Sequence, residues 1–186
     1  MVVMVDEVDD QVGVDEVGRG CLAGPLVTAA VLLDMEALGL REARALSALN
    51  DSKQHTHEAR EALFPVVMRT AAKVAIVSRC APGIDDRGLH RTNLDALRDA
   101  LARVARPGCV CLVDGFAVPD VGHEQRAIVN GDATSAAIAA TYSVELSLAQ
   151  ADDDELMSVM LSAQSSCVEA ARVHLPIALF ESARGG

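Results

Sequence analysis

Aromatic residues are scarce in this chain: they make up 2% of its 186 residues, and tryptophan is absent. Proteins that bind single-stranded nucleic acids without sequence preference stack bases on aromatic rings, so this scarcity argues against such a platform. No apolar stretch approaches the roughly 20 residues of a membrane-spanning helix. The N-terminal segment has no basic region followed by an apolar core, so it does not predict a secretory signal. We therefore expect a cytoplasmic protein with no membrane contact.

The cysteine pattern argues against a fold organised by disulfides, because the five cysteines are odd in number and include no Cys-x-x-Cys pair. This pattern favours a reducing compartment over a disulfide scaffold.

Basic residues are outnumbered: 16 Lys and Arg stand against 27 Asp and Glu, which leaves a formal net charge of −11. Nucleic-acid-binding proteins normally present a basic face to the phosphates. A chain this acidic would need a local basic patch, or bound divalent cations, to do the same.

The length and a 51% hydrophobic content are consistent with a single globular domain over residues 1–186. Apolar runs predict strands over residues 12–17, 26–33, 73–78 and 109–113. Helices are predicted over residues 37–49, 56–69 with a kink or break at Pro65, 94–104, 132–150 and 152–173, and Pro82-Gly83 predicts a turn. The first two strands are closely connected, which favours an antiparallel hairpin. The expected fold class is α/β, with a mixed central sheet flanked by helices.

Two adjacent carboxylates, Asp15 and Glu16, lie near the end of the first predicted strand, and Gly18-Arg19-Gly20 follows. Carboxylate oxygens suit Mg²⁺ or Mn²⁺. The glycines allow close approach of the backbone to a ligand, and the arginine can form a forked contact with a phosphate. Metal and phosphate ligands in one segment indicate phosphodiester chemistry.

A third carboxylate, Asp114, ends the strand over residues 109–113 and is followed by Gly115. Ligands of open α/β sheets gather at the carboxyl ends of strands, so the three acids would converge if the two strands are neighbours. Carboxylates so close repel one another unless a cation binds them. Two such ions, about 3.5–4 Å apart, would stabilise both the attacking and the leaving oxygen of a phosphodiester.

The segment from Gly13 to Gly20, which continues into Cys21-Leu22-Ala23-Gly24-Pro25, resembles the signature of ribonuclease HII, the type 2 ribonuclease H. Further segments resemble that family in order and rough spacing, namely residues 51–53, 84–93, 131–133 and 138–140. The resemblance implies a ribonuclease H-like fold over the whole chain. It weakens after about residue 140, and the helical part from about residue 152 diverges from the family.

The activity implied by this resemblance is endonucleolytic cleavage of the RNA strand of RNA–DNA hybrids, including single ribonucleotides embedded in duplex DNA. Two divalent ions, Mn²⁺ or Mg²⁺, would activate water and leave a 5′-phosphate on the downstream product. Asp15, Glu16 and Asp114 would be the catalytic metal ligands.

The resemblance also implies a substrate-binding set. Gly18, Arg19 and Gly20 would contact the ribose 2′-hydroxyl and the adjacent phosphate, where RNA differs from DNA. Lys53 would lie near the backbone phosphates, although Lys53 taken alone favours the interpretation of a plain turn lysine. The partner is then an RNA–DNA hybrid or a ribonucleotide-containing duplex, bound by a monomer.

The family has a fourth carboxylate on a later helix, and two positions compete for it. An ungapped count from Ile138 reaches Gln150, whereas a count back from Met157 reaches Asp154, one helical turn away. Acids at residues 152–154 could instead begin a new helix, where the helix dipole favours them. The family's tyrosine- and lysine-rich tail is missing, because residues 158–186 contain neither residue type.

These departures keep two alternatives open. One is a catalytically degenerate ribonuclease H-like protein that binds metal or a partner without cleavage. The other is a related nuclease such as a junction resolvase, against which the Gly-Arg-Gly segment argues.

Overall fold

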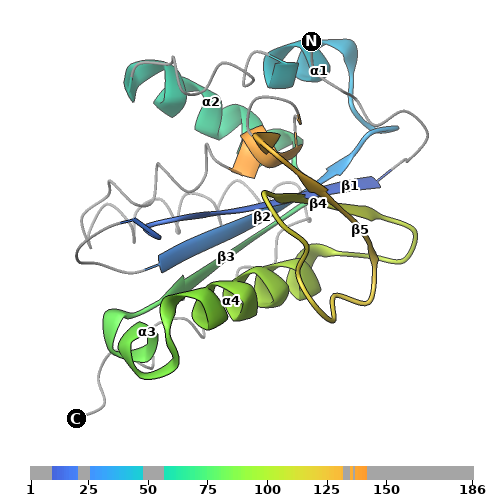
Figure 1. The fold of residues 1–186 in the computed structure, drawn as a ribbon. Coiled ribbons are helices and arrows are strands. Elements are labelled where there is room, and N and C mark those ends of the chain that lie inside the picture. Colours follow the sequence, from blue (N-terminus) through green and yellow to red (C-terminus); the bar gives the residue numbers. More distant parts are fainter. Residues whose placement is uncertain (1–9, 21–25, 48–56, 132–134, 136, 142–186) are drawn as a thin grey trace.

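A five-stranded sheet forms the centre of the computed structural model, which describes residues 10–20, 26–47, 57–131, 135 and 137–141 (Figure 1). The strands are β1 (Asp10–Val17), β2 (Leu26–Asp34), β3 (Lys73–Arg79), β4 (Val110–Asp114) and β5 (Glu124–Ile128). The helices are α1 (Leu40–Ser47), α2 (His57–Thr70), α3 (Ala81–Arg87) and α4 (Leu89–Val104), and residues 137–141 form a further helical segment. No helix in these residues is long and apolar enough to cross a membrane.

The sheet is mixed, with the strand order β3-β2-β1-β4-β5. β1 pairs with β2, and β2 with β3, in the antiparallel sense. β1 also pairs with β4, and β4 with β5, in the parallel sense. The predicted mixed sheet and the opening hairpin are therefore confirmed.

Helices cover both faces of the sheet (Figure 1). On one face, α4 packs its apolar stripe against side chains of β1 to β4. On the other face, α1, α2 and the segment 137–141 pack against β2, β3 and β4. Because the central strands are buried on both faces, they read in sequence as near-continuous apolar runs, and this is why they were predictable.

Three local features differ from the sequence-based expectation. Residues 81–87 form the short helix α3 where a turn was predicted; proline is well tolerated in a first helical turn. α2 continues through Pro65 without dividing, while Val67 and Met68 beyond it are buried in the core. β5 was not predicted, because it lies at the edge of the sheet and its residues are exposed or only partly buried, which leaves no apolar run.

Gly13, in the middle of β1, allows the helical segment 137–141 to lie directly on the sheet. A Cβ atom at Gly13 would lie 2.2 Å from the carbonyl carbon and oxygen of Ala137 and 2.6 Å from the backbone nitrogen of Ile138. Real Cβ atoms do not approach backbone so closely, and a helix backbone cannot move aside as a flexible side chain can. The glycine therefore sets the depth at which this segment docks, next to the end of β1.

We predict that Gly13→Ala lowers the free energy of unfolding by about 3 kcal/mol, because the new methyl group must push the helical segment away from the sheet. Chemical denaturation would measure this. Gly83→Ala is the matched control: its Cβ would meet only ordinary contacts at 3.5 and 3.8 Å within α3, so it should be neutral or stabilising by up to about 1 kcal/mol. Equal stability of the two variants would contradict the assigned role of Gly13.

Candidate active site

Asp15 and Asp114 lie at neighbouring positions of two parallel strands. The last registered pair of β1 and β4 is Val14 with Val113, so the two aspartates are the next residues of their strands. Alternation along each strand puts both side chains on the face covered by the segment 137–141, because Gly13 and Leu112 contact or pack with that segment. The condition set by the sequence, that the two strands are neighbours, is therefore met.

Backbone amides hold one oxygen of each aspartate. Asp15 Oδ1 accepts a hydrogen bond from the Glu16 amide at 2.7 Å, and Asp114 Oδ1 accepts one from the Gly131 amide at 2.7 Å. Gly131 can come this close only without a side chain, since its Cβ would lie 3.0 Å from Asp114 Oδ1 and 2.4 Å from Ile138 Cδ1. The structure thus supplies a physical reason for the glycine at the start of the 131–133 segment.

Glu16 points to the opposite face of the sheet, toward α4, with Val12 and Val14. Its side chain is only 11% exposed, and this burial raises the pKa of its carboxyl group above the usual value. The negative charge of Asp114 raises the pKa further. Arg19 acts in the other direction through its charge and a hydrogen bond from Nη1 to Glu16 Oε1 at 3.3 Å, and the Asn93 amide also lowers the pKa.

Buried polar groups gather on the α4 side of Glu16. Thr28 faces Glu16 across the β1–β2 pair, and Thr92 and Asn93 lie in the first turns of α4; all three are completely buried. Within the described residues, the Thr28 and Thr92 hydroxyls and both Asn93 amide atoms make no hydrogen bond of good geometry. A buried polar group without such a bond is destabilising. Glu16 is therefore flanked by polar side chains, Thr28 on β2 and Asn93 on α4, and not by apolar side chains alone.

The sequence alone predicts no site role for Asn93, which lies on α4. The signal that could have identified it is its spacing, because it lies three and four residues before Ala96 and Leu97, in the buried stripe of α4. An asparagine in such an apolar stripe is unusual, since polar side chains are seldom fully buried.

The Gly18-Arg19-Gly20 turn leaves the sheet directly after β1. Gly18 has a φ of +94°, a conformation that favours glycine, and a Cβ at Gly20 would meet nothing within 4 Å. The Arg19 side chain is 41% exposed and its guanidinium carbon lies 5.4 Å from the centre of the Phe116 ring. The turn therefore leaves the backbone at Gly20 open to a ligand and places the Arg19 cation beside Glu16 and the end of β4.

Within the described part of the chain, no three His, Cys, Asp or Glu side chains form a group ready to hold a metal ion. The side chains of Asp15 and Asp114 lie on one face of the sheet, and the Glu16 side chain leaves β1 on the other face. The charge of Asp114 nevertheless raises the pKa of Glu16. The assignment of these acids as metal ligands remains a prediction. Lys53, Gln150 and Asp154 lie outside the described residues.

Solved structures share this fold. The chain is similar to the ribonuclease H2 of Pyrococcus horikoshii OT3, with a TM-score of 0.65 and 22% sequence identity over 82% of this chain and 76% of that one. It is also similar to Bst-RNase HIII in complex with Mn²⁺, with a TM-score of 0.56 and 21% identity over 90% of this chain and 56% of that one. The expected ribonuclease H-like α/β fold is confirmed.

Among proteins with a ribonuclease H-like fold, sequence comparison identifies the family of this chain. The model of the family Ribonuclease HII matches residues 12–163. The ribonuclease HII of Mycobacterium ulcerans (strain Agy99) is 44% identical over 149 residues, which cover 80% of this chain and 58% of that relative. The chain belongs to the ribonuclease HII family, and it spans somewhat more than half the length of the relative it matches. The family match extends beyond residue 140 and includes the positions of Gln150 and Asp154.

We predict that Glu16→Gln stabilises the protein at neutral pH by about 1 kcal/mol, or about 2–4 °C in melting temperature, because it removes a charge from a buried site. The raised pKa means that the folded protein holds the Glu16 proton more tightly than the unfolded chain. The stability contributed by the Glu16 carboxyl group is present at low pH and is lost as the pH rises through the pKa of Glu16 in the folded protein. The advantage of the variant should therefore shrink as the pH falls.

Thermal unfolding between neutral and mildly acidic pH would test this, with Glu124→Gln as the control. The Glu124 side chain is 60% exposed, so its neutralisation should change stability by no more than about 0.5 kcal/mol. A stability gain for Glu16→Gln that grows as the pH falls would have the wrong sign.

Proposed function

We propose that this chain is a metal-dependent endonuclease that hydrolyses the RNA strand of RNA–DNA hybrids and cuts at single ribonucleotides embedded in duplex DNA. The observation that supports it best is the arrangement at one end of the sheet. Asp15, near the end of β1, and Asp114, the last residue of the neighbouring parallel strand β4, share one face of the sheet, and the turn that contains Arg19 follows β1. The ribonuclease HII family to which the chain belongs supplies the reaction class.

The donor set fits a hard divalent cation. Asp15 and Asp114 offer carboxylate oxygens, and one oxygen of each is oriented by a backbone amide. Glu16 carries a charge that both burial and Asp114 make unfavourable, and a cation would relieve that cost. Mn²⁺ or Mg²⁺, bound as two ions by Asp15, Glu16 and Asp114, would supply an activated water and stabilise the leaving oxygen. The similar Bst-RNase HIII was solved with Mn²⁺.

The protein's own groups would select and orient the substrate. Arg19 can donate a forked pair of N–H groups to a phosphate, and the glycines on either side let backbone approach the ribose. The 2′-hydroxyl is the group by which RNA is distinguished from DNA at such a site. Lys53 near the phosphates and Asp154 as a fourth acid extend this proposal, and the product would carry a 5′-phosphate.

Cleavage of a labelled DNA duplex carrying one ribonucleotide, with Mn²⁺ or Mg²⁺, tests the proposal. We expect a cut on the 5′ side of the ribonucleotide, a 5′-phosphate on the downstream fragment, no cut in an all-DNA duplex and no activity after chelation of divalent ions. Asp15→Asn and Asp114→Asn should each reduce the rate at least about 100-fold, because each removes an anionic metal ligand.

Asp120→Asn is the matched control for both variants. Asp120 is exposed and adopts a φ of +59°, which asparagine tolerates well, so this change should leave the rate within about twofold. A folded protein that binds Mn²⁺ but cuts nothing would favour the degenerate alternative. Cleavage of branched DNA in preference to the ribonucleotide duplex would favour the resolvase alternative.

A further inference from the structure

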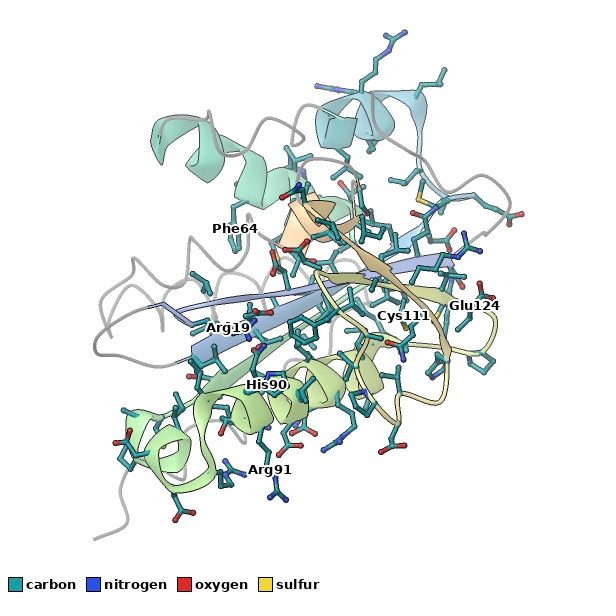
Figure 2. All side chains as sticks on the ribbon, viewed as in Figure 1. Arg19, Phe64, His90, Arg91, Cys111 and Glu124 are labelled. Carbon is teal, nitrogen blue, oxygen red and sulfur yellow. The ribbon has the colours of Figure 1, made fainter. Side chains whose placement is uncertain are left out.

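Three side chains from distant segments, Arg19, His90 and Phe116, lie together at the end of the sheet where Asp114 lies. The Arg19 guanidinium carbon lies 5.4 Å from the centre of the Phe116 ring. The His90 ring, in the first turn of α4, lies 6.0 Å from Phe116, centre to centre, with the planes tilted by 55°. Figure 2 shows Arg19 above His90, between the end of β1 and α4. The chain has only three phenylalanines, and one of them contacts the arginine of its signature turn.

Phe116 is held in place by the same turn that ends β4. Gly115 adopts a φ of +77°, its amide donates to the Ile128 carbonyl at 2.9 Å, and the Phe116 amide donates to the Asp114 carbonyl at 3.0 Å. The ring itself is half-buried against the cluster under α4. The position of Phe116 is therefore tied to that of Asp114, and any group resting on the ring is placed relative to that aspartate.

The guanidinium of an arginine can use its face and its edge for different contacts. A guanidinium stacks on an aromatic ring through its face, which leaves the N–H donors in its plane available. One of these, on Nη1, donates to Glu16 Oε1 at 3.3 Å. In the absence of the ring, that ion pair would be the only contact orienting Arg19 among the described residues, and the Arg19 side chain is 41% exposed. A single ion pair orients a long, partly exposed side chain poorly.

We propose that Phe116, backed by His90, is a positioning residue: it holds Arg19 by the face of its guanidinium so that the edge is directed at the substrate phosphate next to the ribonucleotide. This role deepens the proposed ribonuclease function and rests on it. A cation–π contact at an exposed site corresponds to about a two- to fivefold change in an equilibrium constant, so the effect belongs in substrate binding.

The first test needs no substrate. Ring currents from Phe116 should shift the Arg19 side-chain NMR signals upfield. Phe116→Leu, which keeps apolar bulk, should remove the shift, and Phe116→Tyr, which keeps the ring, should retain it. Phe64→Leu is the control, since Phe64 belongs to α2 on the other side of the sheet (Figure 2). An Arg19 signal that is the same in wild type and Phe116→Leu would overturn the stack.

The second test uses the ribonucleotide duplex. Phe116→Leu should raise KM about two- to fivefold with kcat within about twofold, and Phe116→Tyr should restore the wild-type KM. In an Arg19→Ala background, Phe116→Leu should have no further effect, because the residue acts through Arg19. A KM increase of the same size in that background would overturn the positioning role.

The two proposals fail in different ways. If the wild type cuts no ribonucleotide duplex, the proposed function fails, and the phosphate-directing role falls with it, while the ring-current shift still reports the stack. If the wild type cuts normally and Phe116→Leu leaves KM unchanged, only the role of Phe116 is wrong.

Discussion

The parallel pairing of β1 with β4 is the constraint on which the rest of the candidate site depends. It joins segments about a hundred residues apart, and its register makes Asp15 and Asp114 adjacent at the ends of their strands. Both strands are buried on two faces, so a shift of register would move apolar side chains away from their cores as well as separating the aspartates. The same packing that stabilises the sheet therefore also sets the spacing of the acids.

Two glycines allow backbone to come close to these strand ends. Gly13 admits the helical segment 137–141 onto β1, and Gly131 brings its amide within 2.7 Å of Asp114 Oδ1. Neither contact would survive the addition of a methyl group without movement of the surroundings. The electrostatics complement this geometry: burial of Glu16 and its proximity to Asp114 make negative charge unfavourable, and Arg19 offsets only part of that cost. Although the chain has a net charge of −11, this end of the sheet holds the Arg19 cation beside the candidate acids. Both kinds of group are suited to phosphate chemistry.

Arg19 contacts both of the chain segments that carry candidate metal ligands, the end of β1 and the end of β4. Its guanidinium contacts Glu16, at the end of β1, and Phe116, just beyond β4. A movement of either segment would change how the arginine is presented. Contacts through the face of the guanidinium and hydrogen bonds from its edge do not compete, which is why an aromatic ring can support an arginine that also binds an anion.

The sequence by itself determined the four strands over residues 12–17, 26–33, 73–78 and 109–113, because their apolar residues fill the cores on the two faces of the sheet and therefore recur closely along the chain. It also identified the family, through motifs whose order and spacing are visible along the chain. It did not reveal β5, whose exposed edge position requires no apolar pattern, or the helix over residues 81–87. Only the tertiary structure decided that Asp15 and Asp114 share a face while Glu16 points toward α4, and that Asn93 and Phe116 lie beside Glu16 and Arg19. These relations depend on strand order, register and packing between segments far apart in the chain, and local sequence patterns do not encode them.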